Sequence, residues 1–257
     1  MMFSRALAWM LLAAPLAAAA SESVKLDRLP ADVNPQDRAS LQRGAQVYVN
    51  YCMGCHSLAY MRYNRLQDLG LTEQQIKDNL IFTGVKVGEL MKIAMDPRES
   101  REWFGTPPPD LTVIARSRSS GDGSGADWLY TYLRGFYRDP SRPTGWNNTV
   151  FQNVGMPHAL WQLQGEQVLT TEVQSIPRGS KGEMEKREVH ELVLKKPGSM
   201  KPAEYDRRVG DLVNFLVYVG EPSRQFRVEL GIYVLIFLGV LLVFAYLLKK
   251  EFWKDVH

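Results

Sequence analysis

The chain has 257 residues, and its 31 Lys and Arg residues are nearly balanced by 28 Asp and Glu residues, so the formal net charge is +3 at pH 7. This balance excludes the strongly basic surface that nucleic-acid binding requires, and bulk charge does not identify another partner. The chain contains only two Cys, which excludes a zinc site built from four Cys.

Residues 1–20 are predicted to be a secretory signal peptide. Arg5 provides the charged start, Ala6–Leu16 the apolar stretch, and Ala17–Ala20 a cleavage region of small residues. The apolar run is short and rich in Ala, so an uncleaved anchor is the weaker alternative. We expect the mature chain to start near Ser21, outside the cytoplasmic membrane.

An extended arm over Ser21–Gln36 is expected to lead into a helix over Arg38–Tyr51. Gly44, Tyr48 and Cys52 are four residues apart and therefore share one stripe of the helix. Gly costs ~1 kcal/mol relative to Ala inside a helix, a cost that a generic amphipathic helix leaves unexplained. A close crossing with a second helix explains it.

The sequence Cys52-Met53-Gly54-Cys55-His56 has the spacing C-x-x-C-H. Two thiols at this spacing reach the vinyl groups on one edge of a porphyrin, and the following His lies where its imidazole ligates the iron. A disulfide and half a zinc site are alternatives. A redox-active thiol pair is another, but it needs a βαβ context that is absent here. We therefore predict one covalent haem c on Cys52, Cys55 and His56.

The segment after the motif, Ser57–Leu66, is expected to form a wall of the haem pocket through Tyr60, Met61 and Tyr63. Two short helices are predicted to follow, over Thr72–Leu80 and Val87–Met95. Thr72 and Gln75 have the spacing of a capping box at the start of the first.

Three consecutive Pro in Thr106–Leu111 are incompatible with a helix or a central strand. Such a segment exposes rigid carbonyls, one of which can accept the Nδ1 proton of His56 and fix the ring; a plain loop is the alternative. We expect Asp110 to cap a helix that contains Arg116 and Arg118. These guanidinium groups either pair with haem propionates or face solvent.

The rest of the exported domain divides into three patterns. Asp127–Tyr137 is aromatic and predicts a helix packed on the core or on the haem edge. Gln167–Ile176 and Arg187–Leu194 alternate polar and apolar residues, which predicts a β-hairpin with a charged tip. Pro202–Val219 carries one apolar stripe and predicts a final helix that crosses the helix of Gly44.

Spacing leaves the second protein ligand of the iron open. Met156 lies between Gly155 and Pro157, in an irregular loop that can hold a side chain rigidly. His158 is two residues further on and would give an iron with two His ligands. Met200 precedes the final helix, as the ligand does in many small cytochromes c.

Leu230–Leu248 contains nineteen residues without a charge. At ~1.5 Å per residue it spans nearly the whole ~30 Å hydrocarbon core, so a buried core helix is the weaker alternative. Lys249 and Lys250 follow at once, and the positive-inside rule puts them in the cytoplasm. The expected organisation is an exported domain, an anchor and a tail over residues 21–228, 229–248 and 249–257.

The chain resembles the cytochrome c1 family, the haem subunits of proteobacterial ubiquinol–cytochrome c oxidoreductase (bc1) complexes, in RGAQVYVNYCMGCHSLAYMRY, PPPDLTVIARSR, GMP at Gly155–Pro157, and EYDRRVGDLVNFLVYVGEP before the anchor. The resemblance implies a mainly α, class I cytochrome c-like haem domain with a small β-hairpin insertion and one C-terminal transmembrane helix. It favours Met156 over Met200 as the ligand. It also implies that Pro109 lies beside the axial His and that Arg116 reaches a propionate.

The resemblance implies electron transfer without bond-making. The protein would take one electron from a Rieske iron–sulfur subunit and pass it to a periplasmic cytochrome c, with cytochrome b and membrane lipid as further partners. It would not be an enzyme on its own. It would lie in the bacterial inner membrane, with the haem domain in the periplasm. The hairpin at Gln167–Leu194 differs from the mitochondrial form, so no contact there is carried over.

Two other functions remain open. One is another membrane-anchored monohaem cytochrome, such as an oxidase subunit or an electron shuttle. The other is a haem peroxidase, which needs an open or displaceable sixth site on the iron. Binding of carbon monoxide by the reduced protein distinguishes a peroxidase from a closed His–Met haem.

Overall fold

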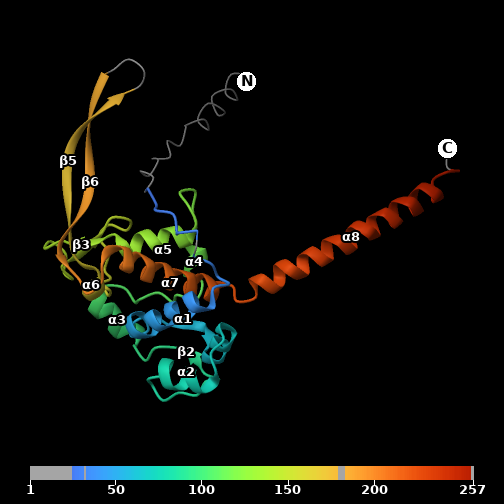
Figure 1. Cartoon of the computed structure of the whole chain (residues 1–257), viewed down its shortest axis with the longest axis horizontal. Coiled ribbons are helices and arrows are strands. Elements are labelled where there is room, and N and C mark those ends of the chain that lie inside the picture. Colours follow the sequence, from blue (N-terminus) through green and yellow to red (C-terminus); the bar gives the residue numbers. More distant parts are fainter. Residues whose placement is uncertain (1–24, 32, 179–182, 256–257) are drawn as a thin grey trace, which may run out of the picture.

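A computed structural model of the chain describes residues 25–31, 33–178 and 183–255. The signal peptide predicted for residues 1–20 and the hairpin turn at 179–182 lie outside the described residues. The described part is mostly helical, with small two-stranded sheets and one long apolar helix at the C-terminal end (Figure 1). The expected mainly α architecture is confirmed at this level.

The domain is built on the crossing of its first and last helices. Helix α1 (Arg38–Val47) continues as one turn of π-helix, η2 (Tyr48–Cys52), and packs against α7 (Pro202–Gly220). A Cβ atom on Gly44 would lie only 2.1 Å from the carbonyl oxygen of Asp211 in α7. The close crossing predicted from Gly44 is therefore confirmed, because only a residue without a side chain permits this approach.

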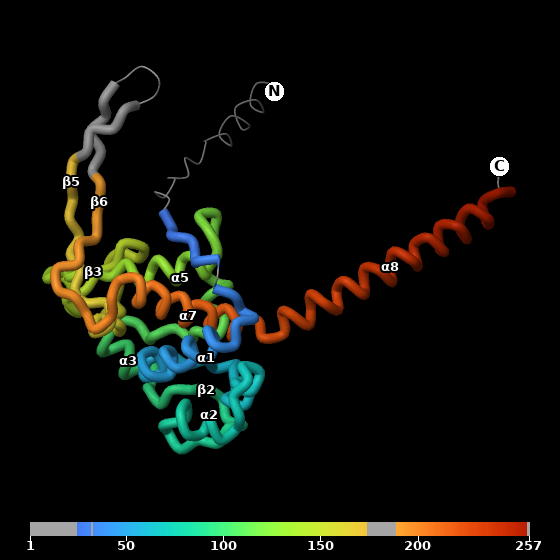
Figure 2. Tube along the Cα trace, viewed as in Figure 1, coloured from blue at the N-terminus to red at the C-terminus, as the bar shows by residue number. Residues whose placement is uncertain are grey.

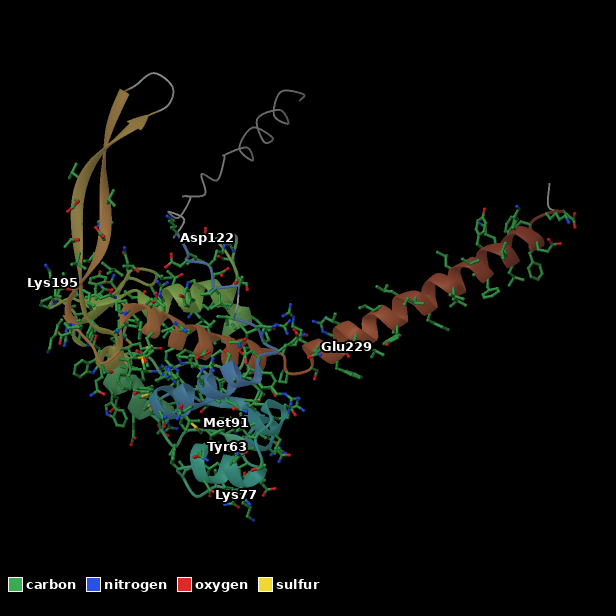
Figure 3. The ribbon with its side chains drawn as sticks, in the orientation of Figure 1. Tyr63, Lys77, Met91, Asp122, Lys195 and Glu229 are labelled. Atoms are coloured by element: carbon green, nitrogen blue, oxygen red, sulfur yellow. The ribbon has the colours of Figure 1, made fainter. Side chains whose placement is uncertain are left out.

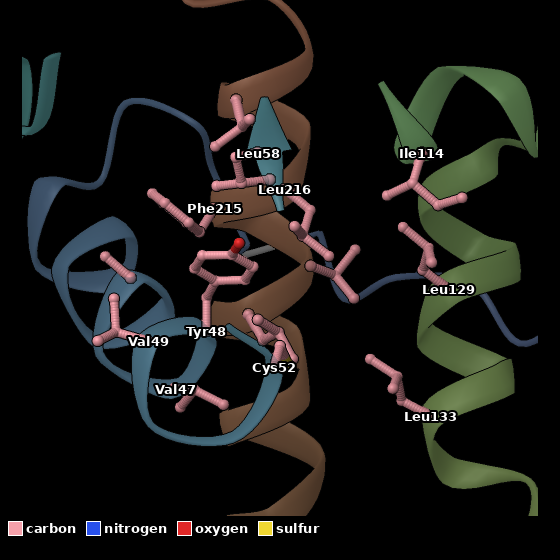
Figure 4. Packing of buried hydrophobic residues seen from close by; sticks show 14 of the residues in the cluster. Val47, Tyr48, Val49, Cys52, Leu58, Ile114, Leu129, Leu133, Phe215 and Leu216 are labelled. Atoms are coloured by element: carbon pink, nitrogen blue, oxygen red, sulfur yellow. The ribbon is translucent and has the colours of Figure 1, made fainter. Parts of the chain in front are cut away.

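The hydrophobic core lies around α7. The rings of Tyr48 and Phe215 are 5.9 Å apart across the helix crossing. Figure 4 shows Cys52 on one side of α7, with Leu129 and Leu133 reaching toward the same region from α5 (Gly125–Arg134). These apolar side chains are buried, and they surround the end of η2 that carries the first Cys of the motif.

A smaller lobe follows the motif. Strand β1 (Leu58–Arg62) pairs antiparallel with β2 (Leu90–Met91), and η3, a 3-10 helix (Tyr63–Leu69), precedes α2 (Glu73–Leu80). Figure 3 shows Met91 and Tyr63 inside this lobe. Met61 and Tyr63 are buried, as expected of wall residues, but Tyr60 is 82% exposed. The expectation for Tyr60 is wrong: the register of β1 against β2 is irregular between Leu58 and Arg62, so Leu58 and Met61 face the core and Tyr60 faces outward.

The two short helices predicted in this lobe have different outcomes. The first is α2, and its capping box is confirmed by reciprocal bonds between Thr72 and Gln75. The helix predicted over Val87–Met95 is wrong. The amide of Asn64 donates to the Val87 carbonyl at 2.8 Å, and the region forms β2. Pairing with a segment more than twenty residues away overrides the local helical pattern.

Short elements connect the lobe to the final helix. Helices α3 (Pro97–Phe104) and α4 (Ile114–Ser117) precede α5, and α6 (Trp161–Gln164) precedes the hairpin. The aromatic helix predicted over Asp127–Tyr137 ends at Arg134 instead, because the next residues form β3 (Phe136–Arg138), which pairs with β4 (Trp146–Asn148). Ser124 caps α5 through the amide of Asp127.

The predicted hairpin is confirmed and is longer than expected. Strands β5 (Gly165–Arg178) and β6 (Glu183–Pro197) pair antiparallel over their whole length and project from the domain (Figure 1). At its base, Gly165 has φ 96°, a conformation that favours Gly. A Cβ there would lie 2.2 Å from the Lys196 carbonyl oxygen. The hairpin is thus a discrete insertion anchored at a tight crossing.

Helix α8 (Arg224–Phe252) has 29 residues. Its most apolar 18-residue window has a mean hydropathy of 2.7, and no residue of that window is buried. It leaves the domain at the end of α7, on the side away from the hairpin (Figure 2). A helix of this length extends ~44 Å at 1.5 Å per residue, which exceeds the ~30 Å of a hydrocarbon core. It is long and apolar enough to cross a membrane and starts before the stretch predicted from sequence.

The crossing of α1 and α7 is tested by replacing Gly44 with Ala. Ala favours a helix interior by ~1 kcal/mol over Gly, but the added Cβ meets backbone at 2.1 Å. We expect Gly44→Ala to lower the free energy of unfolding by ~2 kcal/mol or more, measured by urea denaturation of the full chain in detergent. In the control Gly121→Ala the new Cβ has open space, so stability changes by under ~0.5 kcal/mol. Equal stability of the two variants would disprove the constraint.

Candidate haem site

The two Cys lie on one tight turn. The amides of Cys55 and His56 both donate to the carbonyl of Cys52, at 3.1 and 2.9 Å. Cys52 is buried, Cys55 is half-buried, and neither is in a disulfide. Burial raises the pKa of Cys52 to about 12. Because the thiolate is the nucleophile and metal ligand, a neutral Cys52 is poorly suited to thiol–disulfide chemistry or zinc binding.

His56 is oriented by the Pro-rich segment. Its Nδ1 is 2.7 Å from the carbonyl oxygen of Pro109, so Nδ1 carries the proton and donates it to this acceptor. The contact predicted between the two segments is confirmed. Nε2 has no hydrogen-bond partner among the described residues. Burial lowers the pKa of His56, which keeps the ring neutral and leaves the Nε2 lone pair available to a metal.

Asp110 joins the Pro-rich segment to β1 and does not cap α4. Its Oδ2 accepts from the amide of Ala59 at 2.7 Å, and its Oδ1 accepts from the amide of Thr112 at 2.8 Å. Helix α4 begins after Val113 without a side-chain cap. The predicted cap is wrong because both carboxylate oxygens already have closer partners, and these bonds hold the Pro109 carbonyl in place beside His56.

Met156 lies in a loop that is packed against the core. The hydroxyl of Tyr132 donates to its Sδ at 3.4 Å. A Cβ on Gly155 would lie 3.1 Å from the carbonyl oxygen of Phe104, so a larger residue would crowd the end of α3. The small Gly therefore lets the loop approach α3 closely.

One short segment lies beside both candidate ligand regions. The carbonyl of Phe104 lies next to Gly155, the neighbour of Met156, and the carbonyl of Pro109 accepts from His56. Five peptide units separate Phe104 from Pro109, and an extended chain covers at most ~18 Å in that length. The motif and the loop of Met156 thus lie near the two ends of this segment.

The two arginines of the predicted propionate pair have different environments. The Arg116 side chain is 63% exposed, and its Nη1 lies 3.7 Å from Glu221. Arg118 stacks over the indole of Trp128 at 4.7 Å, and its Nε is buried without a hydrogen-bond partner among the described residues. Arg118 is half-buried, so its guanidinium group is partly shielded from solvent and has room for a further partner.

The rival ligands are held by other contacts. The ring of His158 stacks on Phe136 at 4.8 Å and meets the edge of Trp146 at 5.1 Å. Burial lowers its pKa to about 4. Met200 is half-buried, and its amide donates to the Leu163 carbonyl at 3.1 Å. The ring of His158 is thus enclosed by aromatic rings, but its Nε2 is buried without a hydrogen-bond partner among the described residues, so His158 stays a rival ligand. The Sδ of Met156 accepts from the phenol of Tyr132.

Two residues of the site carried no sequence signal strong enough to single them out. Tyr132 is one of several aromatic residues in α5, and Arg118 is one of two arginines two residues apart. The donor set fits a covalently attached haem, since the described residues offer two unpaired Cys, a His Nε2 without a hydrogen-bond partner and a half-buried arginine whose Nε has no partner. Together with the long apolar helix, these features define a c-type cytochrome with a C-terminal apolar helix.

Comparisons with known proteins agree. The Cytochrome C1 family matches residues 32–100 and 95–256. The chain is 49% identical over 228 residues to cytochrome c1 of Allochromatium vinosum, covering 88% of each chain. It is also 49% identical over 247 residues to the ammonia monooxygenase gamma subunit of Nitrosomonas europaea, covering 96% of this chain and 95% of that protein. Cytochrome c1 of Rhodospirillum rubrum is 28% identical over 238 residues, covering 86% and 83%. The chain belongs to the cytochrome c1 family of electron-transfer proteins.

The buried ring of His158 predicts an acid-sensitive fold. Its pKa of about 4 lies below the ordinary 6.5, so as the pH falls from 6.5 to 4 the unfolded chain takes up the proton first and stability is lost. The shift corresponds to at most ~3 kcal/mol. The variant His158→Phe keeps a flat ring but cannot take up a proton. We expect its free energy of unfolding to fall less than that of the unaltered protein between pH 6.5 and pH 4, measured by urea unfolding at several pH values.

The same substitution at the exposed His190 of β6 is the matched control for this pH series. We expect His190→Phe to follow the unaltered protein. If His158→Phe also follows it, the buried ring makes no contribution to acid sensitivity.

Proposed function

We propose that the chain is the haem-bearing electron-transfer subunit of a bc1-type quinol–cytochrome c oxidoreductase. It receives one electron from a Rieske iron–sulfur subunit and passes it to a cytochrome c outside the membrane. The observation that carries the proposal is the Cys52–His56 turn with the ring of His56 bound to Pro109, in a chain of the cytochrome c1 family. Cytochrome b, the iron–sulfur subunit and membrane lipid are the partners that the family implies.

The proposed ligand set uses residues from two segments. Cys52 and Cys55 would hold the haem as thioethers, and His56 Nε2 and Met156 Sδ would bind the iron. Haem c, when bound, supplies a one-electron couple. The Pro109 carbonyl fixes the orientation of the His56 ring and increases its basicity. The Met thioether, a soft ligand opposite His, raises the potential.

The propionate contact expected of Arg116 stays a prediction, and we propose Arg118 as a second candidate for it. Arg118 is supported by its buried, unpartnered Nε and by its place beside Trp128. Arg116 pairs with Glu221 at the domain surface. The buried core around α5 and α7 excludes water from this side of the site. Because charges interact more strongly where water is excluded, a change of charge at the site has a large effect on neighbouring groups.

The proposed location is the bacterial inner membrane. Residues 1–20 direct export, residues 21–228 form the haem domain in the periplasm, and residues 249–257 stay in the cytoplasm. The apolar helix α8 and Lys249 and Lys250 in its last turn support this orientation. The anchor keeps the haem domain at the membrane surface, where a quinol-oxidising complex works.

A second candidate is supported by the relative named ammonia monooxygenase gamma subunit, which matches 96% of the chain at 49% identity. In this case the protein would serve as a subunit of an oxygenase. The same haem ligands would serve there, so the two candidates differ in the partner and not in the site.

The axial ligand is tested by exchanging Met for Leu, which nearly conserves volume and costs under ~1.5 kcal/mol of packing. We expect Met156→Leu to abolish the thioether signature in the visible spectrum and to let the reduced protein bind carbon monoxide. Met200→Leu is the control and should keep the spectrum of the unaltered protein. The opposite pattern would assign the ligand to Met200, and carbon monoxide binding by the unaltered protein would favour a peroxidase.

The partner is tested by purifying the tagged full chain from native membranes in mild detergent. We expect a di-haem cytochrome b and an iron–sulfur protein to co-purify, with the chain carrying one haem that survives acid–acetone extraction. Quinol should then reduce this haem on a catalytic timescale. Recovery of oxygenase subunits in their place would support the second candidate, and a chain with free thiols would refute both.

A further inference from the structure

We propose that Tyr132 is a positioning residue that raises the reduction potential of the site by donating a hydrogen bond to the thioether of Met156. The inference rests on the proposed ligation by Met156. It adds a residue on α5 that neither the motif nor the family match assigns. The observation behind it is the 3.4 Å separation between the Tyr132 hydroxyl oxygen and Met156 Sδ.

Thioether sulfur is suited to serve two partners at once. It has two lone pairs, so one can bind a metal while the other accepts a hydrogen bond. The phenol of Tyr132 makes its one described hydrogen bond to this sulfur. A phenol is protonated at neutral pH and a thioether has no proton, so Tyr132 is the donor in this bond.

The phenol is held in position from several sides. Its ring stacks on Trp128 at 4.8 Å with 12° between the planes, and it meets Phe136 edge-on at 5.1 Å. The carbonyl oxygen of Tyr132 accepts from Asn148 Nδ2 at 2.7 Å. The ring and backbone are therefore fixed before any ligand binds, which is the requirement for a preorganised donor.

The direction of the effect follows from electron density. A hydrogen bond donated to the sulfur withdraws electron density from it. The sulfur then donates less electron density to a bound metal, and this destabilises the oxidised metal more than the reduced metal. Tyr132 therefore shifts the equilibrium toward the reduced form. The net free energy of one hydrogen bond changes the ratio of reduced to oxidised protein by about two- to tenfold. At 59 mV per tenfold for a one-electron couple, this is a shift of ~20–60 mV in the reduction potential.

The chain contains a control for the loss of a buried phenol hydrogen bond. The hydroxyl of Tyr218 in α7 donates to Asp68 Oδ2 at 2.8 Å, and the side chain of Tyr218 is buried like that of Tyr132. Neither Tyr218 nor Asp68 belongs to the motif or to the loop of Met156, so Tyr218→Phe removes a phenol hydrogen bond without touching a proposed ligand.

The experiment is a potentiometric titration of the full-length holoprotein in detergent, for the unaltered chain, Tyr132→Phe and Tyr218→Phe. We expect Tyr132→Phe to lower the potential by an amount equivalent to two- to tenfold and to shift the thioether band without abolishing it. Tyr218→Phe should leave both unchanged. An unchanged potential in Tyr132→Phe, or an equal fall in both variants, would overturn the proposal.

A double-mutant cycle separates this proposal from the ligand assignment. If Met156→Leu leaves the thioether band intact, the ligand assignment fails and the role of Tyr132 fails with it. If Met156→Leu abolishes the band, Tyr132→Phe should have no further effect on the potential in that background, because the acceptor is gone. A full-sized shift in that background would overturn the role of Tyr132 and leave the ligand assignment standing.

Discussion

The close approach of α1 and α7 at Gly44 is the constraint on which the rest of the domain depends. It brings the end of α1 against the last helix, so that η2 and the motif turn begin at a fixed place on the core. The ion pair between Arg43 and Asp211, at 2.6 Å, joins the same two helices beside the glycine. The first Cys of the motif then lies among buried apolar side chains contributed by α5 and α7.

A few long-range polar contacts turn this scaffold into a site. The Pro109 carbonyl and the Asp110 carboxylate connect one irregular segment to His56 and to β1. A rigid Pro-rich backbone suits this task, because it holds acceptors in place with little loss of entropy on folding. Tyr132 acts in the same way toward Met156 from a regular helix. Each proposed iron ligand is thus supported by a group from a different part of the chain.

The projecting parts of the molecule are separate from the site. The β5–β6 hairpin and helix α8 leave the domain on different sides (Figure 2), and the chain passes from α7 to α8 within the few residues after Gly220. This short connection limits how far the domain can move from the membrane surface if α8 spans it.

Local spacing by itself predicted haem attachment at the C-x-x-C-H motif and determined where the long helices and the hairpin lie. The motif, the helix of Gly44, the final helix and the hairpin follow from residue types at short separations, because periodicity and C-x-x-C-H act within a few turns. Only the tertiary structure decided that Val87–Met95 supplies a strand, that the Nε of Arg118 is buried while Arg116 is exposed, and that Tyr132 reaches Met156. These outcomes depend on which distant segments meet, and burial and pairing across the fold outweigh local propensity there.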